Sequence, residues 1–205
     1  MARERAGERA EATAERILDG ALRAGEIYGF RKLTMDEIAK HAGLARVTIY
    51  THYANKDAIV SALVSRELQA VLATVSAIGD AQTDPVERLV EMFTFGYGWL
   101  RDHALLQRII RTEPEAILPY AAYDSPLLVV GRQWIAGQLA TSFSGGDQDP
   151  EVFEEAAELI VRIVQSLVLS PVSIYDLTDP DGVRTLVRRW IIPIVQEAVS
   201  GVRAD

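Results

Sequence analysis

The sequence of 205 residues predicts an all-α protein, and two kinds of pattern carry that prediction. Apolar residues recur three and four positions apart along most of the chain, whereas no stretch alternates apolar and polar residues over the length of a strand. Helix-start signals also recur. Residues 34–37 and 84–87 have the capping-box pattern, and a proline follows each of Ser125, Asp149 and Asp179. Together these signals predict about nine helices.

The first four helices have identifiable starts and stops. An apolar stripe between Ile17 and Tyr28 marks the first helix, which Gly29 ends. The capping box starts the second helix, and Gly43 ends it because a sharp turn with positive φ favours glycine. Asn55 is the expected cap of the fourth helix. The expected spans are residues 11–28, 35–42, 46–52 and 56–78.

The later helices are longer and richer in apolar residues. Pro85 occupies a first helical turn, where proline is tolerated, and Asp102 is the expected cap of the next helix. Pro193 predicts a kink in the last helix, because proline lacks the amide hydrogen that the preceding turn needs. The expected spans are residues 85–100, 103–111, 126–143, 150–169 and 180–200.

Charge and helix length divide the chain into two expected domains. Residues 1–56 hold ten Lys and Arg against eight Asp and Glu, whereas residues 57–205 hold 11 against 21. This uneven distribution of charge indicates that residues 1–56 carry a surface suited to an anion, whereas the acidic remainder of the chain repels anions. The change to longer helices lies near Asn55. We therefore expect an N-terminal domain at residues 1–55 and a C-terminal helical domain at residues 56–205.

Composition and motifs exclude several classes of protein. The absence of cysteine removes disulfides, thiolate catalysis and cysteine zinc sites, and three histidines leave little for a metal cage, so we expect no metal and no cofactor. No nucleophile elbow, P-loop or H-E-x-x-H motif is present. The best catalytic pair available is His103 with Asp102 or Glu113. We therefore expect a protein that is not an enzyme.

Export and membrane insertion are not expected either. The first 25 residues alternate Arg and Glu where a secretory signal needs an apolar centre. The longest apolar stretch, residues 159–175, is interrupted by Arg162, Gln165 and Pro171, and it falls short of the roughly 20 residues of a membrane span. The sequence therefore predicts a cytoplasmic protein with no membrane partner.

Residues 34–53 fit a helix-turn-helix, the motif whose second helix enters the major groove of DNA. Ala39 lies where two crossing helices leave room for only a methyl group. With Ile49 turned inward, the other face of the second helix presents a set of side chains outward, and Thr48 lies beside them. The outward side chains are those of Arg46, Val47, Tyr50 and Thr51.

These side chains have the chemistry that DNA reading requires. Arg46 can donate two hydrogen bonds to guanine, and Val47 can contact the methyl group of thymine. Phosphate contacts require hydrogen-bond donors from a set of side chains that includes no carboxylate. The backbone amides that follow Thr34 form a helix N-terminus, which also attracts a phosphate. The candidate donors are Thr48, Tyr50, His52 and Lys56. The alternative is an ordinary three-helix core at residues 11–53, with solvated surface charges.

The segment from Ile17 to Lys56 strongly resembles the DNA-binding domain of the TetR family of bacterial repressors. The resemblance is carried by GFRKLTMDEIAKHAGLARVTIYTHYANKDAIV, with its threonine-capped helix, Ala-x-x-Ala-Gly turn and Thr-Ile-Tyr sequence. It implies sequence-specific binding of double-stranded operator DNA by a repressor. The positions that it implies in base or backbone contact are Arg46, Val47, Thr48, Tyr50, Thr51, His52 and Lys56, with Thr34 at a phosphate.

Two departures from the family pattern and one N-terminal segment qualify this interpretation. Ala45 stands where a cap such as serine is usual, and Thr51 replaces a common aromatic residue, which leaves the contact from position 51 open. The residues before Ala14 include Arg3, Arg5 and Arg9, which an arm would carry to a neighbouring minor groove. Interleaved glutamates favour a frayed helix with solvated charges instead.

The helices expected at residues 150–169 and 180–200 are apolar over more than one face, which predicts a further partner. We expect these helices to pair across a twofold axis in a homodimer, as the resemblance also implies, with a monomer core as the alternative. The candidate interface residues are Ile160, Val164, Leu167, Trp190 and Ile194. A homodimer presents two recognition helices, so the operator is expected to be a near-palindrome.

Aromatic and polar residues between positions 85 and 143 are candidates for a largely apolar ligand pocket. They are Phe95, Trp99, Gln107, Tyr120, Tyr123, Trp134 and Phe143. Alternatively, each aromatic is ordinary core. The resemblance implies a small-molecule effector that binds somewhere in the body and releases the protein from DNA. Two other interpretations stay open: a DNA-binding regulator without a small-molecule ligand, and an enzyme in the C-terminal body.

Overall fold

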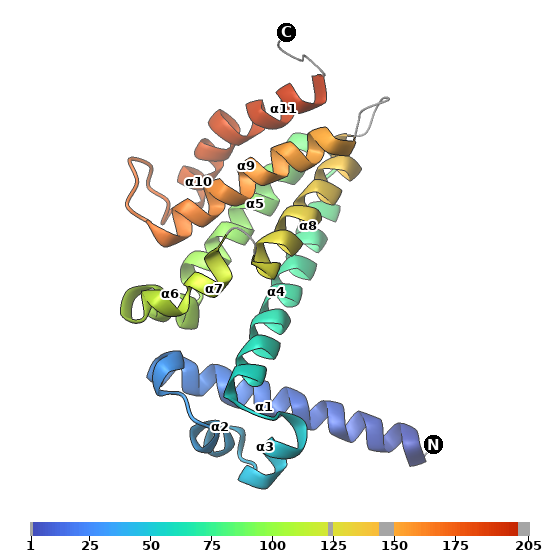
Figure 1. Ribbon diagram of the computed structural model, residues 1–205. Helices are drawn as coiled ribbons and strands as arrows, with labels where there is room; N and C mark the ends of the chain where they lie inside the picture. The colour runs from blue at the N-terminus through green and yellow to red at the C-terminus, as the bar shows by residue number, and fades with distance from the viewer. Residues whose placement is uncertain (1, 123–124, 144–149, 201–205) are drawn as a thin grey trace. The chain divides into compact units, whose positions relative to one another are not determined.

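The computed structural model describes residues 2–122, 125–143 and 150–200, and it contains helices and no strand over these ranges (Figure 1). The predicted all-α fold class is confirmed. The chain forms two compact units: the first comprises Met1–Gln69 and His103–Ile117, and the second comprises Ala70–Asp102 and Leu118–Asp205. These packing units do not test the predicted functional boundary at residues 55 and 56, which stays a prediction.

The first unit contains the predicted helix-turn-helix. Its elements are α1 (Ala2–Lys32), α2 (Met35–Ala42), α3 (Arg46–His52), the first part of α4 (Lys56–Asp80), α6 (Ala104–Thr112) and the 3₁₀ turn η1 (Pro114–Ala116). The bounds of α2 and α3 are those predicted. Gly29 interrupts α1 with φ 74° and ψ 173°, as the predicted stop requires. α1 begins earlier than predicted because alanine, the strongest helix former, recurs through its first turns.

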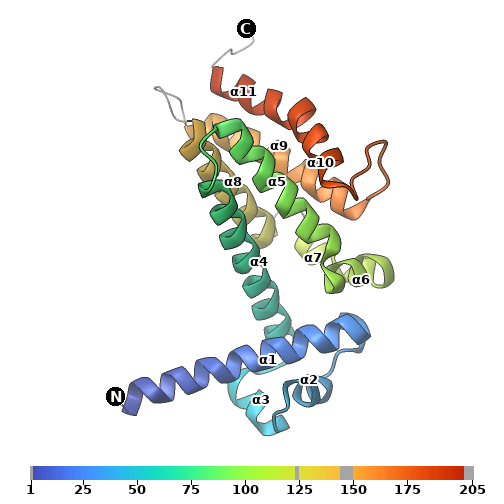
Figure 2. The ribbon, with the colours of Figure 1, turned by 180° about the vertical axis from the view of Figure 1, so that it is seen from behind.

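The second unit contains the later part of α4 and seven further elements within the described residues. These are α5 (Pro85–Asp102), α7 (Leu118–Ala121), α8 (Pro126–Phe143), α9 (Pro150–Leu169), α10 (Pro180–Leu186), the π-helical turn η2 (Val187–Ile191) and α11 (Ile192–Ser200). α8 packs along α9, and α11 packs on α9. Figure 2 shows α5 against α8, α9 and α10. The sequence did not predict η1 and α7, because each is too short to show a helical period.

Oxygen side chains cap the helices at most of the predicted positions. The hydroxyl of Thr34 accepts from the amide of Glu37 at 3.2 Å, as the capping box requires. Asn55 and Asp84 cap α4 and α5 with acceptor distances of 2.8 to 2.9 Å. Ser125 and Asp179 also bind the first-turn amides of α8 and α10. The predicted cap at Asp149 lies outside the described residues.

The cap of α6 differs from the prediction. His103, not Asp102, is the N-cap residue, and its Nδ1 accepts from the amide of Leu106 at 3.2 Å. Its Nε2 lies 3.5 Å from the carboxylate of Glu67 on α4. Asp102 is instead the last residue of α5, and it pairs with its neighbour Arg101 at 2.6 Å.

Pro193 changes the last helix in the way that its missing amide hydrogen requires. The residues just before it, Val187–Ile191, form a π-helical turn in which the amide of Ile192 bonds to the carbonyl of Val187. A π-turn inserted into an α-helix is a common accommodation of such an interruption. The expected disturbance is therefore present as a wider turn between α10 and α11.

A close approach of two helices builds the first unit around α1 and α2. A Cβ atom added at Gly20 of α1 would lie 2.6 to 2.8 Å from the backbone nitrogen, Cα and Cβ of Ala42 on α2. Ala42 is almost fully buried, and so is Ala39, which the sequence placed at the helix crossing. Since Gly20 has no side chain, the backbones of α1 and α2 can approach to this distance.

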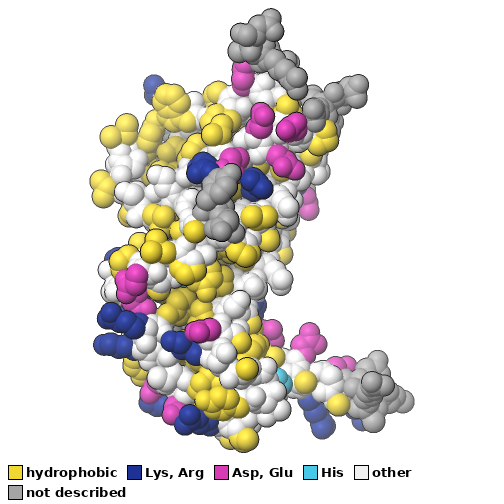
Figure 3. Space-filling model, viewed as in Figure 1, with side chains coloured by type: hydrophobic (Ala, Val, Ile, Leu, Met, Phe, Trp, Pro, Cys, Tyr) yellow, Lys and Arg dark blue, Asp and Glu magenta, His cyan; other side chains and the backbone are white. Residues whose placement is uncertain are grey.

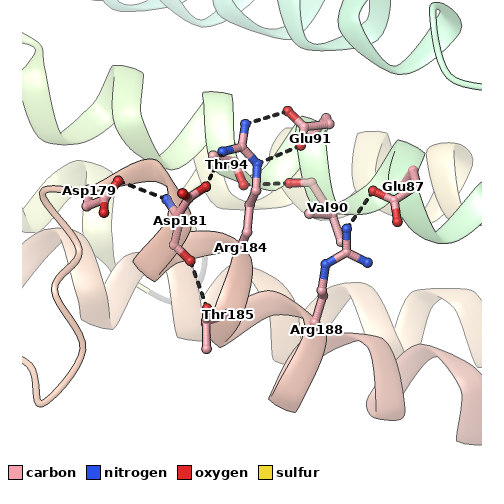
Figure 4. A network of polar contacts seen from close by, with 9 residues as sticks. All are labelled: Glu87, Val90, Glu91, Thr94, Asp179, Asp181, Arg184, Thr185 and Arg188. Carbon is pink, nitrogen blue, oxygen red and sulfur yellow. Dashed lines mark hydrogen bonds and ion pairs between the residues drawn. The ribbon is translucent and has the colours of Figure 1, made fainter.

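Ion pairs fasten α10 to α5 in the second unit (Figure 4). The guanidinium of Arg184 donates to both carboxylate oxygens of Glu91, at 2.7 and 3.1 Å, and also to Asp181 at 2.8 Å. One turn further on, in η2, Arg188 pairs with Glu87 of α5. A two-point contact of this kind fixes direction as well as distance, so these pairs set how α10 lies on α5.

Of the described helices, α4 alone has the length and mean hydropathy, 1.5, of a membrane span. Core helices of soluble proteins reach the same values. The N-terminal part of α4 carries Arg66, whose guanidinium pairs with Glu15 and Asp19 of α1 at 3.1 and 2.9 Å. These ion pairs fix that part of α4 against α1 within the first unit.

Replacing Gly20 by alanine is expected to destabilise the first unit by about 1–3 kcal/mol, because the new methyl group must push the backbone of α2 away. The matched control is Gly7→Ala in the same helix. No atom lies within 4 Å of a Cβ at that position, so the control is expected to be neutral or stabilising by up to about 1 kcal/mol. Denaturant unfolding of both variants measures the difference, and equal stability would contradict the close approach.

Replacing Glu91 by glutamine is expected to make the second unit less stable at neutral pH. The hydrogen bonds from Arg184 hold the pKa of the Glu91 carboxyl below its ordinary value of 4.5. A group with a lowered pKa stabilises the fold above its unfolded-state pKa and ceases to do so as the pH falls through the lowered value. We expect Glu91→Gln to lower the free energy of unfolding by about 0.5–1 kcal/mol at pH 7.

The predicted difference between wild type and Glu91→Gln shrinks as the pH is lowered below 4.5. Thermal unfolding of both proteins at successive pH values follows it. A difference that stays constant over that range would show that the carboxylate charge does not hold α10 on α5.

Candidate DNA-binding interface

The turn between α2 and α3 is fixed by backbone and side-chain hydrogen bonds. Gly43 has left-handed angles (φ 63°, ψ 36°), and its amide bonds to the carbonyl of Lys40 at 3.2 Å. The next amide, that of Leu44, bonds to the carbonyl of Ala39 at 3.0 Å. This pair of bonds is the Schellman motif, and it requires the positive φ that the sequence predicted for Gly43.

Two arginines of α1 hold the carboxyl end of α2. The guanidinium of Arg16 donates to the carbonyls of Ala42 and Gly43, both at 3.2 Å. Arg23 donates to the carbonyl of His41 at 2.9 Å. The last carbonyls of a helix have no partner within the helix and carry partial negative charge, so guanidinium groups stabilise them. α1 thereby positions the turn from which α3 starts.

α3 is anchored by one buried side chain and lacks a side-chain cap. Ile49 is fully buried, as predicted. Ala45, the N-cap residue, makes no side-chain hydrogen bond to the first turn. The helix is only seven residues long, and short helices depend on tertiary packing for stability. The position of α3 therefore depends on Ile49 and on the turn that precedes it.

The outward face of α3 presents the side chains that the sequence assigned to DNA. Val47 is 73% exposed and Tyr50 is 45% exposed. Arg46 and Thr51 are also exposed, whereas Thr48 and His52 are half-buried. The hydroxyl of Thr51 donates to the carbonyl of Val47 at 2.9 Å, so it is already used within the helix.

A carboxylate and an aromatic ring hold the guanidinium of Arg46. Its Nη1 lies 3.1 Å from Asp36 in the first turn of α2, and its Nη2 lies 3.4 Å from the hydroxyl of Tyr50. The guanidinium also lies over the Tyr50 ring, 5.6 Å from its centre. The hydrogen bond with Tyr50 and the charge of Asp36 raise the pKa of Arg46. Both terminal nitrogens of Arg46 therefore have a partner within the first unit.

The remaining predicted phosphate contacts lie in two places. Thr34 is exposed at the N-terminus of α2, where its hydroxyl is occupied by the amide of Glu37. Lys56 is half-buried at the start of α4, and its ammonium group donates to the carbonyl of Phe30 at 3.1 Å. An ammonium group has three donors, so this bond leaves capacity for a phosphate. It also gives Lys56 a structural role that sequence reasoning missed.

The predicted pocket residues are distributed over both units. Gln107 lies on α6 in the first unit, and it is half-buried. In the second unit Phe95 is exposed, whereas Trp99, Tyr120, Trp134 and Phe143 are half-buried. Tyr123 lies outside the described residues. The aromatic residues buried most deeply in α5 are Phe93 and Tyr97.

A cavity of about 170 Å³ does lie in the second unit, among α7, α8 and α9. Its lining includes Leu128, Arg132, Glu158 and Arg162, and none of the predicted pocket residues that the structure describes is part of that lining. The pocket prediction rested on aromatic residues, whereas this cavity is formed by aliphatic and charged side chains. No periodic pattern in the sequence distinguishes these charges from ordinary surface charges.

The five predicted interface residues differ in their surroundings. Ile160 is buried by its own unit, and Val164, Leu167 and Ile194 are half-buried. Trp190 is 54% exposed, its indole Nε1 donates to the hydroxyl of Tyr175 at 2.6 Å, and the guanidinium of Arg189 lies 5.4 Å from its ring centre. Trp190 is the predicted interface residue that leaves most apolar surface uncovered.

The catalytic pair considered from the sequence serves structural roles here. His103 caps α6, and the carboxylate of Glu113 is buried and accepts from the amide of Arg31 at 2.9 Å. A Cβ at Gly29 would overlap that carboxylate, so the glycine makes room for it. Within the described residues, no group of three or more His, Cys, Asp or Glu could hold a metal ion.

Comparison with known proteins agrees with this arrangement. Residues 17–63 match the family described as bacterial regulatory proteins, tetR family. An uncharacterized HTH-type transcriptional regulator of Mycobacterium tuberculosis (strain CDC 1551 / Oshkosh) is 29% identical over 197 residues, covering 95% of this chain and 91% of its own length. An HTH-type transcriptional repressor of the same species (strain ATCC 25618 / H37Rv) is 29% identical over 99 residues, 48% of this chain and 51% of its own length.

Among solved structures, the TetR family repressor AlkX from a Dietzia strain, implicated in biodegradation of n-alkanes, has a similar fold. Its TM-score is 0.65 at 21% sequence identity, over 91% of this chain and 96% of that chain. This likeness covers both units of the chain, and it supports the fold alone.

The pairing of Arg46 with Asp36 predicts a specific effect of Asp36→Asn. Removal of a negative charge beside the outward face of α3 is expected to raise affinity for random duplex DNA about two- to fivefold and to lower discrimination between operator and random DNA. The matched control is Glu154→Gln, which makes the same change of net charge on α9. Salt-dependent binding curves measure both effects, and equal gains for the two variants would assign the change to net charge alone.

Proposed function

Because the chain belongs to the tetR family of bacterial regulatory proteins, we propose that it is a homodimeric transcriptional repressor that binds a palindromic operator and is released by a small, largely apolar effector. Its role as a helix-turn-helix regulator of transcription is common to the relatives that it matches. The observation that carries the proposal is the outward face of α3, where Arg46, Val47 and Tyr50 are exposed on a helix that Ile49 anchors from behind.

In this proposal α3 reads base edges in the major groove. Arg46 donates twice to the O6 and N7 of guanine, the commonest specific contact in such complexes, and Val47 contacts a thymine methyl group. Asp36 and Tyr50 support this by holding the guanidinium outside the fold before binding, which lowers the entropy cost of the contact. The contact from Thr51 stays the least supported of the set, since its hydroxyl bonds to the helix backbone.

Phosphate contacts then set the register of the protein on DNA. The proposed contacts come from the α2 amides behind Thr34 and from Thr48, Tyr50, His52 and Lys56. Helix α2 is eight residues long and has its N-cap in extended geometry, so its first amides point out of the helix end. These contacts carry no sequence information, and they account for the salt dependence of binding.

The homodimer is proposed from the apolar surface of the second unit. α9 and α10–α11 leave Trp190 and Leu159 about half exposed, and a second copy of the chain would cover them. Closed twofold symmetry is the commonest arrangement of soluble oligomers. Two copies of α3 related by that axis require an operator with two half-sites, separated by one or more turns of the double helix.

Release by an effector follows from linkage between two binding sites. An effector that binds more tightly to the form with the wrong spacing of recognition helices weakens operator binding, and DNA weakens effector binding by the same factor. The alternative, a regulator without a small-molecule ligand, predicts operator affinity that no small molecule changes. No enzymatic step, metal or cofactor is part of the proposal, and it assigns the protein to the cytoplasm, where its DNA lies.

Selection from a random pool of duplexes by the purified full-length protein tests the proposal. Enrichment of a near-palindrome is expected. The binding constant for the selected site is then expected to fall more steeply with salt concentration than a single helix-turn-helix would give. Enrichment of a single half-site would contradict the dimer. No enrichment at all, from protein shown to carry no copurified ligand, would contradict sequence-specific binding.

Arg46→Ala and Lys56→Ala are expected to act differently on the selected operator. Loss of the guanidinium is expected to remove discrimination worth about 1–3 kcal/mol, whereas loss of the ammonium is expected to weaken all sequences alike and to lower the salt slope by about one. Since Lys56 also binds the carbonyl of Phe30, thermal unfolding of Lys56→Ala is the necessary control. Equal losses on operator and random DNA for Arg46→Ala would overturn its assignment to a base.

A further inference from the structure

A cluster of two arginines and one glutamate joins α8 to α9 in the second unit. The carboxylate of Glu158 lies 3.3 Å from Nη1 of Arg132 on α8, and 2.7 and 2.6 Å from Nε and Nη2 of Arg162 on its own helix. Figure 3 shows basic and acidic side chains side by side on the surface over α8 and α9. One carboxylate is thus shared by two guanidinium groups, which leaves the cluster with a net charge of +1.

The cluster lines the cavity of about 170 Å³ together with aliphatic side chains. Leu128 and Val129 come from α8, and Val161 comes from α9. On the α7 side, the amide of Gln165 donates to the carbonyl of Ala121 at 2.6 Å, which fixes that edge of the cavity. The cavity therefore combines an apolar wall with a positive end, and both helices that build it are also packed along each other.

One polar atom of Arg132, a residue that lines this cavity, has no hydrogen-bond partner. The Nε of Arg132 is buried and makes no hydrogen bond, although a guanidinium nitrogen is a strong donor. Glu158 binds Nη1, on the other side of the guanidinium group, so the edge that carries Nε is not the one that Glu158 occupies. A buried donor without a partner costs free energy, and a shift of the Arg132 side chain that brings Nε to a bound acceptor would remove that cost.

The charges of Arg132, Arg162 and Glu158 indicate that the cavity favours an anionic ligand. The hydrogen bonds and charges of the two arginines lower the pKa of Glu158, so the carboxyl is ionised at neutral pH and is already bound on both oxygens. A cationic ligand would have to displace an arginine from it. An anion, in contrast, can bind the guanidinium of Arg132, which is part of the cavity lining, in the two-point geometry that guanidinium and carboxylate share.

We propose that this cavity binds a small monocarboxylate whose apolar part is about the size of a benzene ring, with its carboxylate on Arg132 and its apolar part against Leu128, Val129 and Val161. A dry cavity of about 150 Å³ in another protein holds benzene, which sets this size. The site itself does not depend on the proposed function. Its role as the effector site does, and that role narrows the effector to an anionic, partly apolar molecule.

The test is a calorimetric titration of the full-length protein with benzoate, benzyl alcohol and inorganic phosphate. Benzoate is expected to bind at least tenfold more tightly than the other two, because benzyl alcohol lacks the charge and phosphate lacks the apolar part. Equal binding of benzoate and benzyl alcohol would overturn the role of Arg132. Equal binding of benzoate and phosphate would leave only a general anion site, and no binding of benzoate would overturn the proposal altogether.

Two variants act in opposite directions, which separates ligand binding from misfolding. Arg132→Gln is expected to weaken benzoate binding about 10- to 100-fold, because a hydrogen bond to a charged group is lost. Glu158→Gln is expected to strengthen it, because the competing carboxylate is removed, and a misfolded protein would not bind more tightly. Arg111→Gln on α6 is the control for net charge, and its benzoate affinity is expected to equal that of the wild type.

The effector role is measured separately, by release of the selected operator on addition of benzoate. Release from wild type and not from Arg132→Gln supports both the site and its role. Benzoate binding that depends on Arg132 without any release of operator keeps the site and overturns its role as effector site. Loss of the dimer in Arg132→Gln, with benzoate affinity unchanged, would assign the arginine to the subunit interface and overturn the site.

Discussion

The close approach of α1 and α2 at Gly20 and Ala42 is the contact on which the DNA-binding surface depends. Because Gly20 has no Cβ, the backbones come near enough for Arg16 and Arg23 of α1 to reach the last carbonyls of α2. Those bonds fix the end of α2. Gly43, which follows in left-handed geometry, then sets the direction in which the chain continues into α3. α3 is short and has no side-chain cap, so it takes its position from this turn and from Ile49. Base reading requires side chains that are held in place by the elements behind them, and these contacts are the ones that position α3.

Local signals in the sequence predicted most helices, and long-range contacts account for what they missed. The helix bounds of α2, α3, α8 and α9 are those expected, because capping residues, prolines and apolar periods act within a few residues of one another. The prediction that Asp102 caps α6 was wrong. His103 is the cap, and its ring lies beside Glu67 of another helix. Of the candidate DNA-binding interface, the sequence likewise predicted the local features and missed a contact between helices. Exposed Val47 follows from the helical period, whereas the pairing of Arg46 with Asp36 joins two helices and has no signature in a single sequence.

The two units use their charges differently. In the first unit, several arginines bind backbone carbonyls at helix ends or carboxylates of neighbouring helices. In the second unit, arginines sit between helices, where Arg184 fastens α10 to α5 and Arg132 shares Glu158 with Arg162. The first of these contacts is saturated, whereas the second leaves a buried donor without a partner beside a cavity. An arginine with all its donors bound is a structural ion pair, whereas one with an unbound donor is a candidate ligand contact. Neither arrangement can be predicted from the sequence, because the partners lie far apart along the chain.

Methylation interference on the selected operator is the most direct measurement of whether α3 reads bases through Arg46. A methyl group on guanine N7 removes the acceptor that the guanidinium needs while leaving the phosphates unchanged. The account predicts that methylation of one guanine in each half-site blocks binding of the wild type, and that the same methylation has no further effect on Arg46→Ala. Interference at the same guanines in both proteins, or in neither, would contradict it.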